Sequence, residues 1–505
     1  MTPAPLLLAV DQGTSATKAL LIDGAGSVVG SASVPISAAH PHPGWVEQSA
    51  EEIWRSATRA VEACLAGRDG RDRLDGAQVV GIGVSSQRES CLLWDRATGQ
   101  PLGPVLGWQD RRTAPACARL LAEGLGPLVR TTTGLPLDPM FSALKAQWLL
   151  DTYDPDRTRS RRGELCLGTV DSWLLWRLSG HTSHIIEIGN ASRTQLLDVR
   201  TRHWDERLLG VFGVPGEVLP RIVASTGPFP AARGLSAVPD GTPVGAVLGD
   251  SHAALFGHGV FAPGSVKVTY GTGSSVMGLI HTSAQAEHSP LCLTIAWDDG
   301  TPAYALEGNI RSSGATLRWL AGLFGTDEAD LAARAAPDAA GVHLVPAFGG
   351  LGAPWWDNEA AGLVSGLTFA AGLPELARAA LESIAFQVED VVAGLDAPGT
   401  PVAALLADGG PTDNATLMQL QADISGRTLR RPRTRALSAL GAAHLAGCSL
   451  GLFTKESLTA TTSAADVYHP QWSPARRADR LSAWHEAVSR ARTTSPAPPG
   501  PAISP

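Results

Sequence analysis

Residues 243–276, PVGAVLGDSHAALFGHGVFAPGSVKVTYGTGSSV, hold the pattern around which the rest of the sequence is organised. An apolar run from Val244 to Leu248 ends on Gly249-Asp250, which is typical of a buried strand with a carboxylate at its tip. A second expected strand, residues 265–270, runs into the Gly/Thr/Ser-rich turn 271–275. A carboxylate can take a proton from an alcohol, and main-chain N–H groups of such a turn can hold phosphate oxygens. The stretch predicts a phosphoryl-transfer site, although a helix-capping Asp beside an ordinary hairpin loop would fit this stretch equally well.

Length and composition indicate a large protein with two domains. The 505 residues exceed the roughly 250–300 at which a single hydrophobic core stops growing. Hydrophobic residues make up 44% of the chain and charged residues 17%, which supplies ample core material. The net charge of −8 and the absence of a basic cluster argue against a nucleic-acid-binding surface.

The cysteines and the N-terminal stretch indicate the compartment. Six cysteines are scattered without a CxxC pair, which fits a reducing environment and argues against a structural zinc site. The opening MTPAPLLLAVDQG has no basic region, and its apolar run is far shorter than the ~20 residues of a membrane span. We therefore expect a cytoplasmic protein that binds neither membrane nor nucleic acid.

The first polar motif is a turn between two apolar stretches near the N-terminus. Residues 5–10 and 19–22 are typical of strands, and DQGTSATK, residues 11–18, lies between them. Hydroxyl and N–H groups of this turn could hold phosphate, with Lys18 as a point charge. The turn matches neither Walker A nor GxGxxG, so it does not support the folds that carry those motifs. A plain hairpin turn is the alternative.

Polar residues at the end of another expected strand indicate a site for hydroxyl groups. The strand 79–85 ends in Ser86-Gln87-Arg88-Glu89-Ser90. A guanidinium beside a carboxylate can meet both the acceptor and the donor of a hydroxyl. Trp108, in LGWQDRR, would offer an aromatic face next to them. The alternatives are a surface ion pair and a core tryptophan.

Glycine-rich turns recur in the second half. The stretch ADGGPTDN, residues 407–414, follows an expected strand and leads into an expected helix, 415–424. Such a turn lets a flat base approach the backbone and leaves Asn414 near the helix start. Gly/Thr turns in both halves, at 11–18 and 271–275, predict two similar α/β lobes that face one another with a nucleotide between them.

Other segments are expected to be structural. Apolar spacing predicts an amphipathic core helix over residues 374–395. Residues 437–446 are expected to form an Ala/Gly-rich helix. Asn190-Ala191-Ser192-Arg193-Thr194 is also expected to have a structural role.

Together these stretches resemble the FGGY family of carbohydrate kinases, and within it the glycerol kinases, over about residues 5–455. The resemblance implies a bilobal, ribonuclease-H-like α/β fold of the actin/hexokinase ATPase type around a central cleft. It also implies transfer of the γ-phosphate of ATP, with Mg²⁺, to a polyol or sugar hydroxyl, of which glycerol going to glycerol 3-phosphate is the nearest case. The stretches that carry it, in order, are AVDQGTSATKALLID, HPGWVEQSAEEIW, SSQRES, GWQDRRTA, TTGLPLDPMFSALKAQWLL, GTVDSWLLW, NASRT, GDSHAALFGHG, TYGTGSS, YALEGNI, GLGAPWWD, ALESIAFQ and ADGGPTDN.

The resemblance implies a role for individual residues. Asp250 would be the general base, and Asp11 and Asp250 would hold Mg²⁺ directly or through water. Lys18 stands where glycerol kinases commonly have Arg, a change that loses a bidentate fork. The residues implied for ATP are Thr14, Ser15, Lys18, Thr272, Gly273, Gly314, Gly410 and Asn414. Those implied for the acceptor are Arg88 and Glu89 on its hydroxyls, Trp108 on its carbon chain, and Met140, Asp250, Ser251 and Ser275.

Three acceptor positions depart from the glycerol-kinase pattern. Met140, Ser251 and Ser275 stand where those enzymes have Tyr, Gln and Phe. The changes remove a hydroxyl, shorten a reach and remove an aromatic wall, and each missing partner of a buried hydroxyl costs about 1–3 kcal/mol. One alternative is therefore a kinase for a larger polyol or sugar, such as a tetritol, pentitol or ketose. Another is a non-catalytic ATP-binding sensor, against which Asp11 and Asp250 argue.

The resemblance also suggests the division of the chain. We expect an N-terminal FGGY domain at residues 1–253, with acceptor and phosphate binding, and a C-terminal, nucleotide-binding FGGY domain at 254–455. Residues 456–490 would form a C-terminal extension, and 491–505 a disordered tail. A homodimer or homotetramer is expected.

Overall fold

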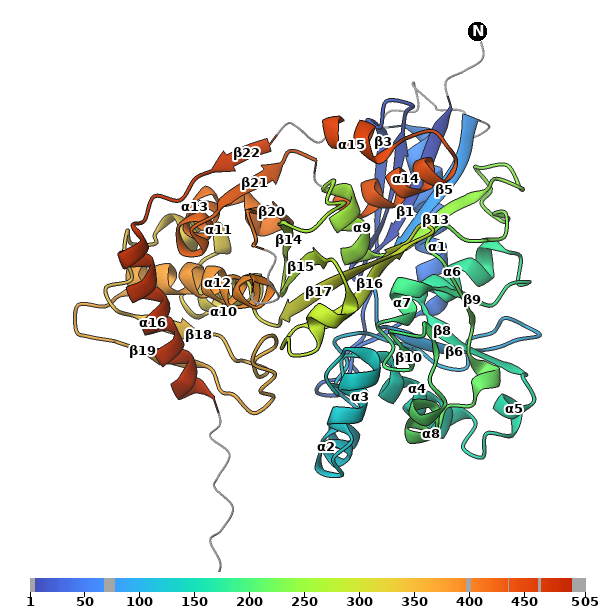
Figure 1. Cartoon of the computed structure of the whole chain (residues 1–505), viewed down its shortest axis with the longest axis horizontal. Helices are drawn as coiled ribbons and strands as arrows, with labels where there is room; N and C mark the ends of the chain where they lie inside the picture. Colours follow the sequence, from blue (N-terminus) through green and yellow to red (C-terminus); the bar gives the residue numbers. More distant parts are fainter. Residues whose placement is uncertain (1–4, 68–77, 397–400, 435, 462–464, 493–505) are drawn as a thin grey trace, which may run out of the picture. The chain divides into compact units, whose positions relative to one another are not determined.

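The structure, a computed structural model, describes residues 5–67, 78–396, 401–434, 436–461 and 465–492 (Figure 1). The chain divides into two units: unit 1 consists of residues 1–263, 277–306 and 432–465, and unit 2 of residues 264–276, 307–431 and 466–505. The predicted tail, 491–505, lies outside the described residues except for its first two.

Unit 1 is built on a five-stranded sheet in which three neighbouring strands run parallel. β5 pairs in parallel with β1 and with β13, whereas β1 with β2 and β2 with β3 are antiparallel. The predicted hairpin is therefore confirmed, but its turn is shorter than residues 11–18: Asp11 and Gln12 belong to β1 and residues 16–18 to β2, which leaves residues 13–15 as the turn. Gln12 and Gly249 both pair with Ser86, so the carboxyl ends of β1, β5 and β13 meet at one edge. The strand order is β13 (Val244–Gly249), β5 (Val79–Ser86), β1 (Leu6–Gln12), β2 (Ala16–Ile22) and β3 (Val28–Pro35).

Helix α14 (Leu437–Ser449) covers one face of this sheet. It packs on β1, β5 and β13, and against α9 (Asp250–Gly257). A Cβ on Gly441 of α14 would come within 1.8 Å of the carbonyl oxygen of Ala253, so the two helices touch backbone to backbone. The Ala/Gly-rich sequence of α14 therefore positions α9, with Asp250 at its first residue, against the sheet.

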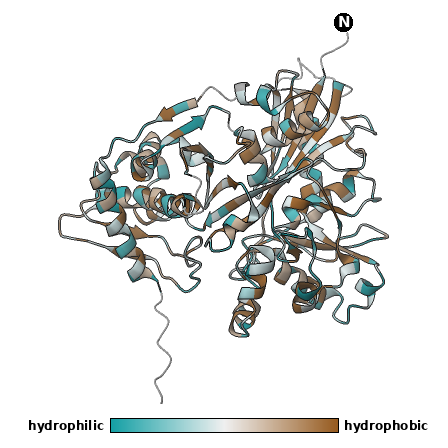
Figure 2. Cartoon of the chain, viewed as in Figure 1, coloured by the Kyte–Doolittle hydropathy of each residue, from teal (hydrophilic) through white to brown (hydrophobic). Residues whose placement is uncertain are grey.

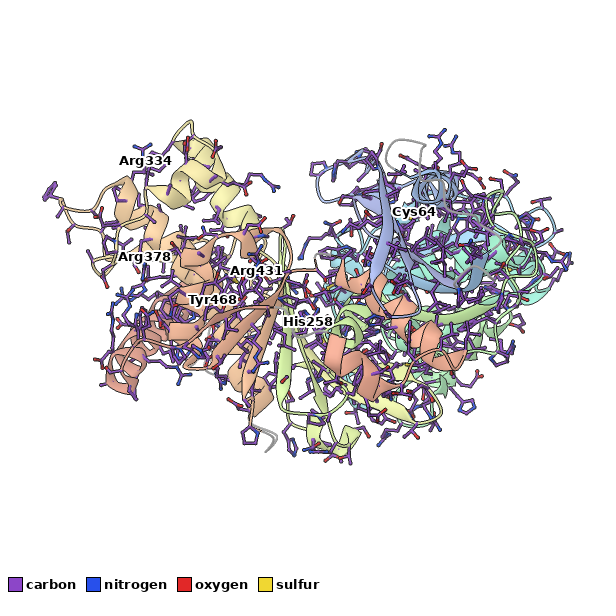
Figure 3. All side chains as sticks on the ribbon, turned by 90° about the horizontal axis from the view of Figure 1, so that it is seen from above. Cys64, His258, Arg334, Arg378, Arg431 and Tyr468 are labelled. Atoms are coloured by element: carbon purple, nitrogen blue, oxygen red, sulfur yellow. The ribbon has the colours of Figure 1, made fainter. Side chains whose placement is uncertain are left out.

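Helix α1 (Ala50–Ala66) covers the other face, where alternate residues of the strands form a separate core. The helix begins after its predicted cap, because the Ser49 hydroxyl accepts from Glu52 N at 3.3 Å. Cys64 of α1, labelled in Figure 3, is buried in that core. All residues of β1 and β13 are buried, which explains their continuous apolar sequences.

A second, four-stranded sheet lies in unit 1 beside the chain segment 87–90. The segment leaves the end of β5 and leads directly into β6, so it connects the two sheets. Helix α4 (Ser142–Tyr153) packs on β6. The strand order is β4 (Glu47–Gln48), β7 (Val105–Leu106), β6 (Cys91–Asp95) and β8 (Leu165–Thr169).

Unit 2 also has parallel strands at its centre. β14 (Ser265–Tyr270) pairs in parallel with β20 (Ala404–Asp408), which pairs in parallel with β21 (Thr428–Pro432). Helix α12 (Leu373–Asp396) packs against α10 (Gly314–Leu323) and α13 (Ala415–Ser425). With this second unit, the predicted α/β class is confirmed.

Ion pairs fix helix α16 (Pro474–Ala491) in unit 2. Arg477 Nη2 lies 2.6 Å from Glu389 Oε1 of α12. Figure 2 shows both hydrophilic and hydrophobic residues along α16, and Trp484 is buried. A second pair lies within α12 itself, where Arg378, labelled in Figure 3, donates to Glu382 at 2.8 Å.

The remaining elements complete the described chain, in which no helix has the length and apolar character that a bilayer crossing requires. The other helices are α2 (Ala114–Ala122), α3 (Gly126–Thr133), α5 (Thr158–Arg161), α6 (Val170–Leu178), α7 (Ile188–Ala191), α8 (Glu206–Phe212), α11 (Glu328–Ala333) and α15 (Lys455–Thr461). The other strands are β9 (Ile185–Glu187), β10 (Leu197–Asp198), β11 (His203–Trp204), β12 (Arg221–Val223), β15 (Ser274–Ile280), β16 (Cys292–Asp298), β17 (Pro302–Ile310), β18 (His343–Val345), β19 (Leu363–Ser365) and β22 (Ala465–Tyr468).

Candidate functional site

The predicted site residues fall into both units. Unit 1 holds most of the acceptor set and the first phosphate turn: Asp11, Thr14, Ser15, Lys18, Arg88, Glu89, Trp108, Met140, Asp250 and Ser251. Unit 2 holds Thr272, Gly273, Ser275, Gly314, Gly410 and Asn414.

Asp250 stands at the carboxyl end of β13, as its sequence predicts. Its Oδ1 accepts from Arg88 Nε at 3.1 Å and from the N–H of Ser251 at 2.7 Å. The Arg88 side chain is 4% exposed, whereas that of Asp250 is 34% exposed. One carboxylate oxygen is therefore anchored by a buried guanidinium, while the side chain remains accessible to a substrate.

Asp11 lies at the end of the neighbouring strand β1. Its Oδ1 accepts from the Ser85 hydroxyl at 2.9 Å, and the residue is buried. Burial raises the pKa of the Asp11 carboxyl above its usual range, Lys18 and Ser85 oppose that rise, and the charge of Asp250 adds to it. The two carboxylates are therefore close enough to repel one another, a repulsion that a cation would relieve.

Two carboxylates are too few for a metal site made of protein ligands alone, but they suit Mg²⁺. Mg²⁺ commonly takes one or two carboxylates and completes its shell with water and substrate phosphates. Among the residues that the structure describes, no group of three or more His, Cys, Asp or Glu side chains could hold a metal ion. Asp11 and Asp250 are the candidates for such an ion.

Hydrogen bonds tie Trp108 to the first phosphate turn. Its indole Nε1 donates to Thr14 Oγ1 at 3.0 Å, and its backbone N–H donates to Ser90 Oγ at 3.1 Å. Gln48 Nε2 donates to the carbonyl oxygen of Thr14 at 2.7 Å. Because the Thr14 hydroxyl accepts from the indole, its own proton can be donated to a phosphate oxygen.

Glu89 is held in an unusual backbone conformation beside Arg88. Its φ is 61°, in the left-handed region that few non-glycine residues adopt. Its Oε1 accepts from Arg193 Nε at 2.7 Å, and its carbonyl oxygen accepts from the Ser142 hydroxyl at 2.9 Å. Sequence reasoning missed Arg193, although an arginine in an otherwise apolar and small-residue segment was a signal of a buried acid partner.

Lys145, which was not predicted from the sequence as a site residue, fixes Met140 and Phe141 in the loop before α4. Lys145 is fully buried, and its ammonium donates to the carbonyl oxygens of Met140 and Phe141. Burial lowers the pKa of Lys145 to about 8, against the opposing charge of Glu89. A lysine on the apolar face of a short helix was the sequence signal that could have predicted this buried contact.

Ser275 belongs to a buried polar network in unit 2. Its hydroxyl accepts from Lys267 Nζ at 3.1 Å and donates to Glu307 Oε1 at 2.8 Å. Both charged residues are completely buried. The serine therefore bridges Lys267 and Glu307 through its hydroxyl, a bridge that a phenylalanine at this position would remove.

A cavity of about 670 Å³ in unit 2 brings together four of the eight residues predicted for the nucleotide, Thr272, Gly314, Gly410 and Asn414. Its volume lies in the usual range for small-molecule sites. Gly273 lies in the adjoining turn and does not line the cavity. The lining residues are Gly271, Thr272, Gly314, Leu317, Arg318, Glu328, Ala329, Ala332, Ala333, Gly410, Pro411, Asp413, Asn414 and Thr416.

Two of these glycines permit a close approach of backbones. A Cβ on Gly314 would lie 2.6 Å from the carbonyl oxygen of Gly271, and one on Gly273 would lie 2.3 Å from that of Ile310. Gly314 N donates to Gly271 O at 2.9 Å. The turn 271–273 can therefore lie against the start of α10 only because Gly273 and Gly314 have no side chain.

The wall formed by α11 was not predicted. Ala329, Ala332 and Ala333 line the cavity at the i, i+3, i+4 spacing of one helix face. Their short side chains leave room for a flat group, and the ion pair of Arg318 with Glu328, at 2.8 Å, lies at the same wall. The spacing of alanines in DEADLAARAA was the available signal.

Comparisons with known proteins agree over nearly the whole chain. Models of the N-terminal and C-terminal domains of the FGGY family of carbohydrate kinases match residues 6–257 and 266–450. A glycerol kinase of Aromatoleum aromaticum is 42% identical over 495 residues, 96% of this chain and 98% of the relative. An apulose kinase of Pectobacterium atrosepticum is 41% identical over 496 residues, 97% and 98% of the two chains.

A solved structure has the same fold. The glycerol kinase of Plasmodium falciparum, crystallised with ADP, superposes with a TM-score of 0.89 at 29% identity and covers 97% of this chain and 99% of that one. The two-domain, actin-like ATPase fold that the sequence predicts is confirmed.

Proposed function

This chain belongs to the FGGY family of carbohydrate kinases, and within that family we propose that it phosphorylates glycerol to glycerol 3-phosphate, with Asp250 as the general base. The observation that carries the proposal is the carboxylate at the tip of β13, which is accessible and yet held by the buried Arg88. Glycerol is proposed because glycerol kinases about 42% identical to this chain align over nearly its whole length.

In the proposed phosphoryl transfer, the residues of this chain carry out one proton transfer. Asp250 takes the proton of the acceptor hydroxyl, whose oxygen forms the new bond to the γ-phosphorus as the bond to the leaving ADP breaks. Arg88 orients Asp250, since its Nε donates to Oδ1. Arg88 and Glu89 then fix the acceptor's other hydroxyls, which they can meet as donor and acceptor.

The nucleotide is assigned to the cavity of unit 2 and its phosphates to the glycine-rich turns. Thr272 and Gly273 would offer N–H groups, and Thr14, Ser15 and Lys18 would offer hydroxyls and a positive charge. Asp11 and Asp250 would hold Mg²⁺, which when bound neutralises the developing charge of the phosphates. The proton transfer itself remains with Asp250.

A larger sugar is the second candidate acceptor. Met140, Ser251 and Ser275 replace the Tyr, Gln and Phe of glycerol kinases, and the hydroxyl of Ser275 is engaged by Lys267 and Glu307. A relative 41% identical to this chain is an apulose kinase. The alternative of a non-catalytic ATP-binding sensor is not supported, because the chain belongs to a kinase family and has the ion pair of Arg88 with Asp250.

An acceptor panel tests the proposal and separates the two candidates. We would measure ADP release with glycerol, tetritols, pentitols and ketoses at saturating MgATP, with Asp250→Asn as the control for contaminating kinases. The proposal expects glycerol to give the highest kcat/KM. A larger polyol or sugar that exceeds glycerol by tenfold or more would establish the second candidate instead.

A further inference from the structure

We propose that the segment Ile188–Thr194, which contains NASRT, is a positioning element that holds both acceptor-binding side chains, Arg88 and Glu89, from behind. The inference rests on the proposed function, since it takes these two side chains as the ones that bind the acceptor's hydroxyls. Two adjacent residues of the segment, Ser192 and Arg193, carry it.

Arg193 fixes the carboxylate of Glu89 directly. Its Nε donates to Glu89 Oε1 at 2.7 Å, and the two side chains are 0% and 6% exposed. The guanidinium carbon also lies 5.1 Å from the centre of the Phe141 ring. A charge-assisted bond and a stacked ring together leave the guanidinium little freedom, so Oε1 of Glu89 is held in place and Oε2 is left for an acceptor hydroxyl.

The backbone of Glu89 adds to this restraint. Its left-handed conformation is kept by the Ser142 hydroxyl, which donates to its carbonyl oxygen, and by the turn in which Ser90 N donates to Arg88 O at 2.7 Å. Such conformations persist when the surroundings determine them from several sides. The direction of the Glu89 side chain is therefore set before any acceptor arrives.

A chain of polar contacts links Ser192 to Arg88. Ser192 Oγ lies 2.9 Å from Thr294 Oγ1, which lies 3.1 Å from His252 Nε2. The same Nε2 lies 3.4 Å from Arg88 Nη1. A guanidinium can only donate, so this last contact is a hydrogen bond when Nε2 is the unprotonated nitrogen, and Arg88 and the Thr294 hydroxyl then share its single lone pair. This second link is longer than the one to Glu89.

The segment itself is fixed independently of the acceptor. The Glu187 carboxylate caps its first turn, accepting from Gly189 N at 2.7 Å and from Asn190 N at 2.8 Å. Ser225 donates to the same carboxylate at 2.6 Å, and Asp171 accepts from Glu187 N at 3.0 Å. These groups are completely buried, so the support is rigid.

Orientation explains the buried pair better than stability does. Two charges lose their hydration when they are buried, and a well-packed apolar residue of similar size is often as stabilising as a buried ion pair. A catalytic site, in contrast, loses much of its rate when a binding group moves by 1 Å. Removing Arg193 would leave the buried Glu89 carboxylate without this partner and so destabilise the fold, which makes the acceptor KM the readout that separates orientation from stability.

Kinetics of Arg193 variants test the proposal. We expect Arg193→Met to raise the acceptor KM by tenfold or more and to lower kcat, with the ATP KM changed less than twofold. Arg193→Lys should recover part of the acceptor KM, because it keeps a donor and the charge. Thr294→Val, which removes one hydroxyl from the link to Arg88, should raise the acceptor KM by a smaller factor, about threefold.

Arg177→Met is the matched control. Arg177 also forms an ion pair, with Glu51 at 2.7 Å, and lies over the rings of Trp54 and Trp173, but it has no contact with Arg88 or Glu89. It should lower the melting temperature and leave the acceptor KM unchanged. An Arg193→Met enzyme that behaves in the same way would overturn the positioning role alone.

Two other outcomes are also decisive. Should Arg193→Met fail to fold, an acceptor KM unchanged in both Arg193→Lys and Thr294→Val would overturn the role. A wild-type enzyme that phosphorylates no acceptor of the panel would overturn the proposed function, and the positioning role with it.

Discussion

Ser275 places a hydroxyl between two buried charges, Lys267 and Glu307, at a position where glycerol kinases have a phenylalanine. Such a substitution changes two things at once: it provides a polar group and removes a bulky one. If Ser275 lines the acceptor site as proposed, we expect the acceptor preference to change with this single residue.

Ser275→Phe should move the preference toward glycerol. The ring restores the apolar wall, so we expect the ratio of kcat/KM for glycerol to that for a pentitol or ketose to rise tenfold or more. Loss of a partner for Lys267 and Glu307 should also lower the free energy of unfolding by about 1–3 kcal/mol. Ser275→Ala, which loses the hydroxyl without adding the ring, separates the two effects: a preference that moves equally in both variants would contradict the steric explanation.

Lys145 should make stability depend on pH in a definite window. Its pKa is lowered from 10.5 to about 8 by burial. Between those values the unfolded chain still binds the proton that the folded chain has lost, so this residue makes stability rise with pH there, by up to about 1.4 kcal/mol per pH unit. Below pH 8 the charge is present in both states, and the cost of burying it is fully expressed.

Urea denaturation of wild type and Lys145→Met at several pH values checks this prediction. Other groups titrate in the same window, so the quantity to compare is the wild-type free energy of unfolding minus that of the variant. It should increase from pH 8 to pH 10.5. A difference that stays constant or falls with pH would show that the lysine is not buried as a cation.

At the scale of elements, helix α10 joins the nucleotide cavity to the turn 271–273. Gly314→Ala would bring a Cβ within 2.6 Å of the Gly271 carbonyl oxygen, so the helix start must shift. We expect ADP affinity to fall tenfold or more and stability to fall by about 1–3 kcal/mol. Calorimetric titration and thermal unfolding measure both.

Gly322→Ala on the same helix is the control. A Cβ there meets nothing within 4 Å, so the change should leave ADP affinity unaltered and stabilise the helix by about 0.5–1 kcal/mol. Equal losses of ADP affinity in the two variants would contradict the role given to the α10 start.

Some elements of the fold could be predicted from the sequence and others could not, and the difference has a physical reason. The hairpin of β1 and β2, the strand that ends at Asp250, and the helix after Asn414 follow from local patterns of apolar, glycine and capping residues, and all three are present. The alanine spacing in α11 marks one face of a helix, but the sequence does not show what that face lines, because this depends on the space that another element leaves beside it.

Individual contacts were harder still. Arg193 lies 104 residues from Glu89, and Trp108 lies 94 residues from Thr14. Nothing in the local sequence identifies either partner, so the sequence of NASRT alone favours a structural role. Parallel strands bring such residues together because their carboxyl ends share one edge, so the edge was predictable while the partners were not.

For the whole molecule, the nucleoside of the nucleotide is assigned to the cavity of unit 2, and the hydroxyls of the acceptor to Arg88 and Glu89 of unit 1. ADP should therefore protect backbone amides of residues 271–275, 314–318 and 410–416 from hydrogen exchange, since these surround the cavity of unit 2. The acceptor alone should protect residues 88–90 and 138–142 of unit 1. If ADP protected residues 88–90 and 138–142 of unit 1 and left the unit 2 segments unprotected, the assignment of the nucleoside to unit 2 would be contradicted.

The central claim is that binding of the nucleotide and abstraction of the proton are separate tasks, the second belonging to Asp250. One measurement tests it most directly: kcat with the best acceptor and the dissociation constant of ADP, determined side by side for wild type and Asp250→Asn. The amide keeps the shape of the side chain and cannot take a proton, so kcat should fall by about 10²–10⁴-fold or more while ADP affinity changes little. An Asp250→Asn enzyme that turns over at the wild-type rate would contradict the account.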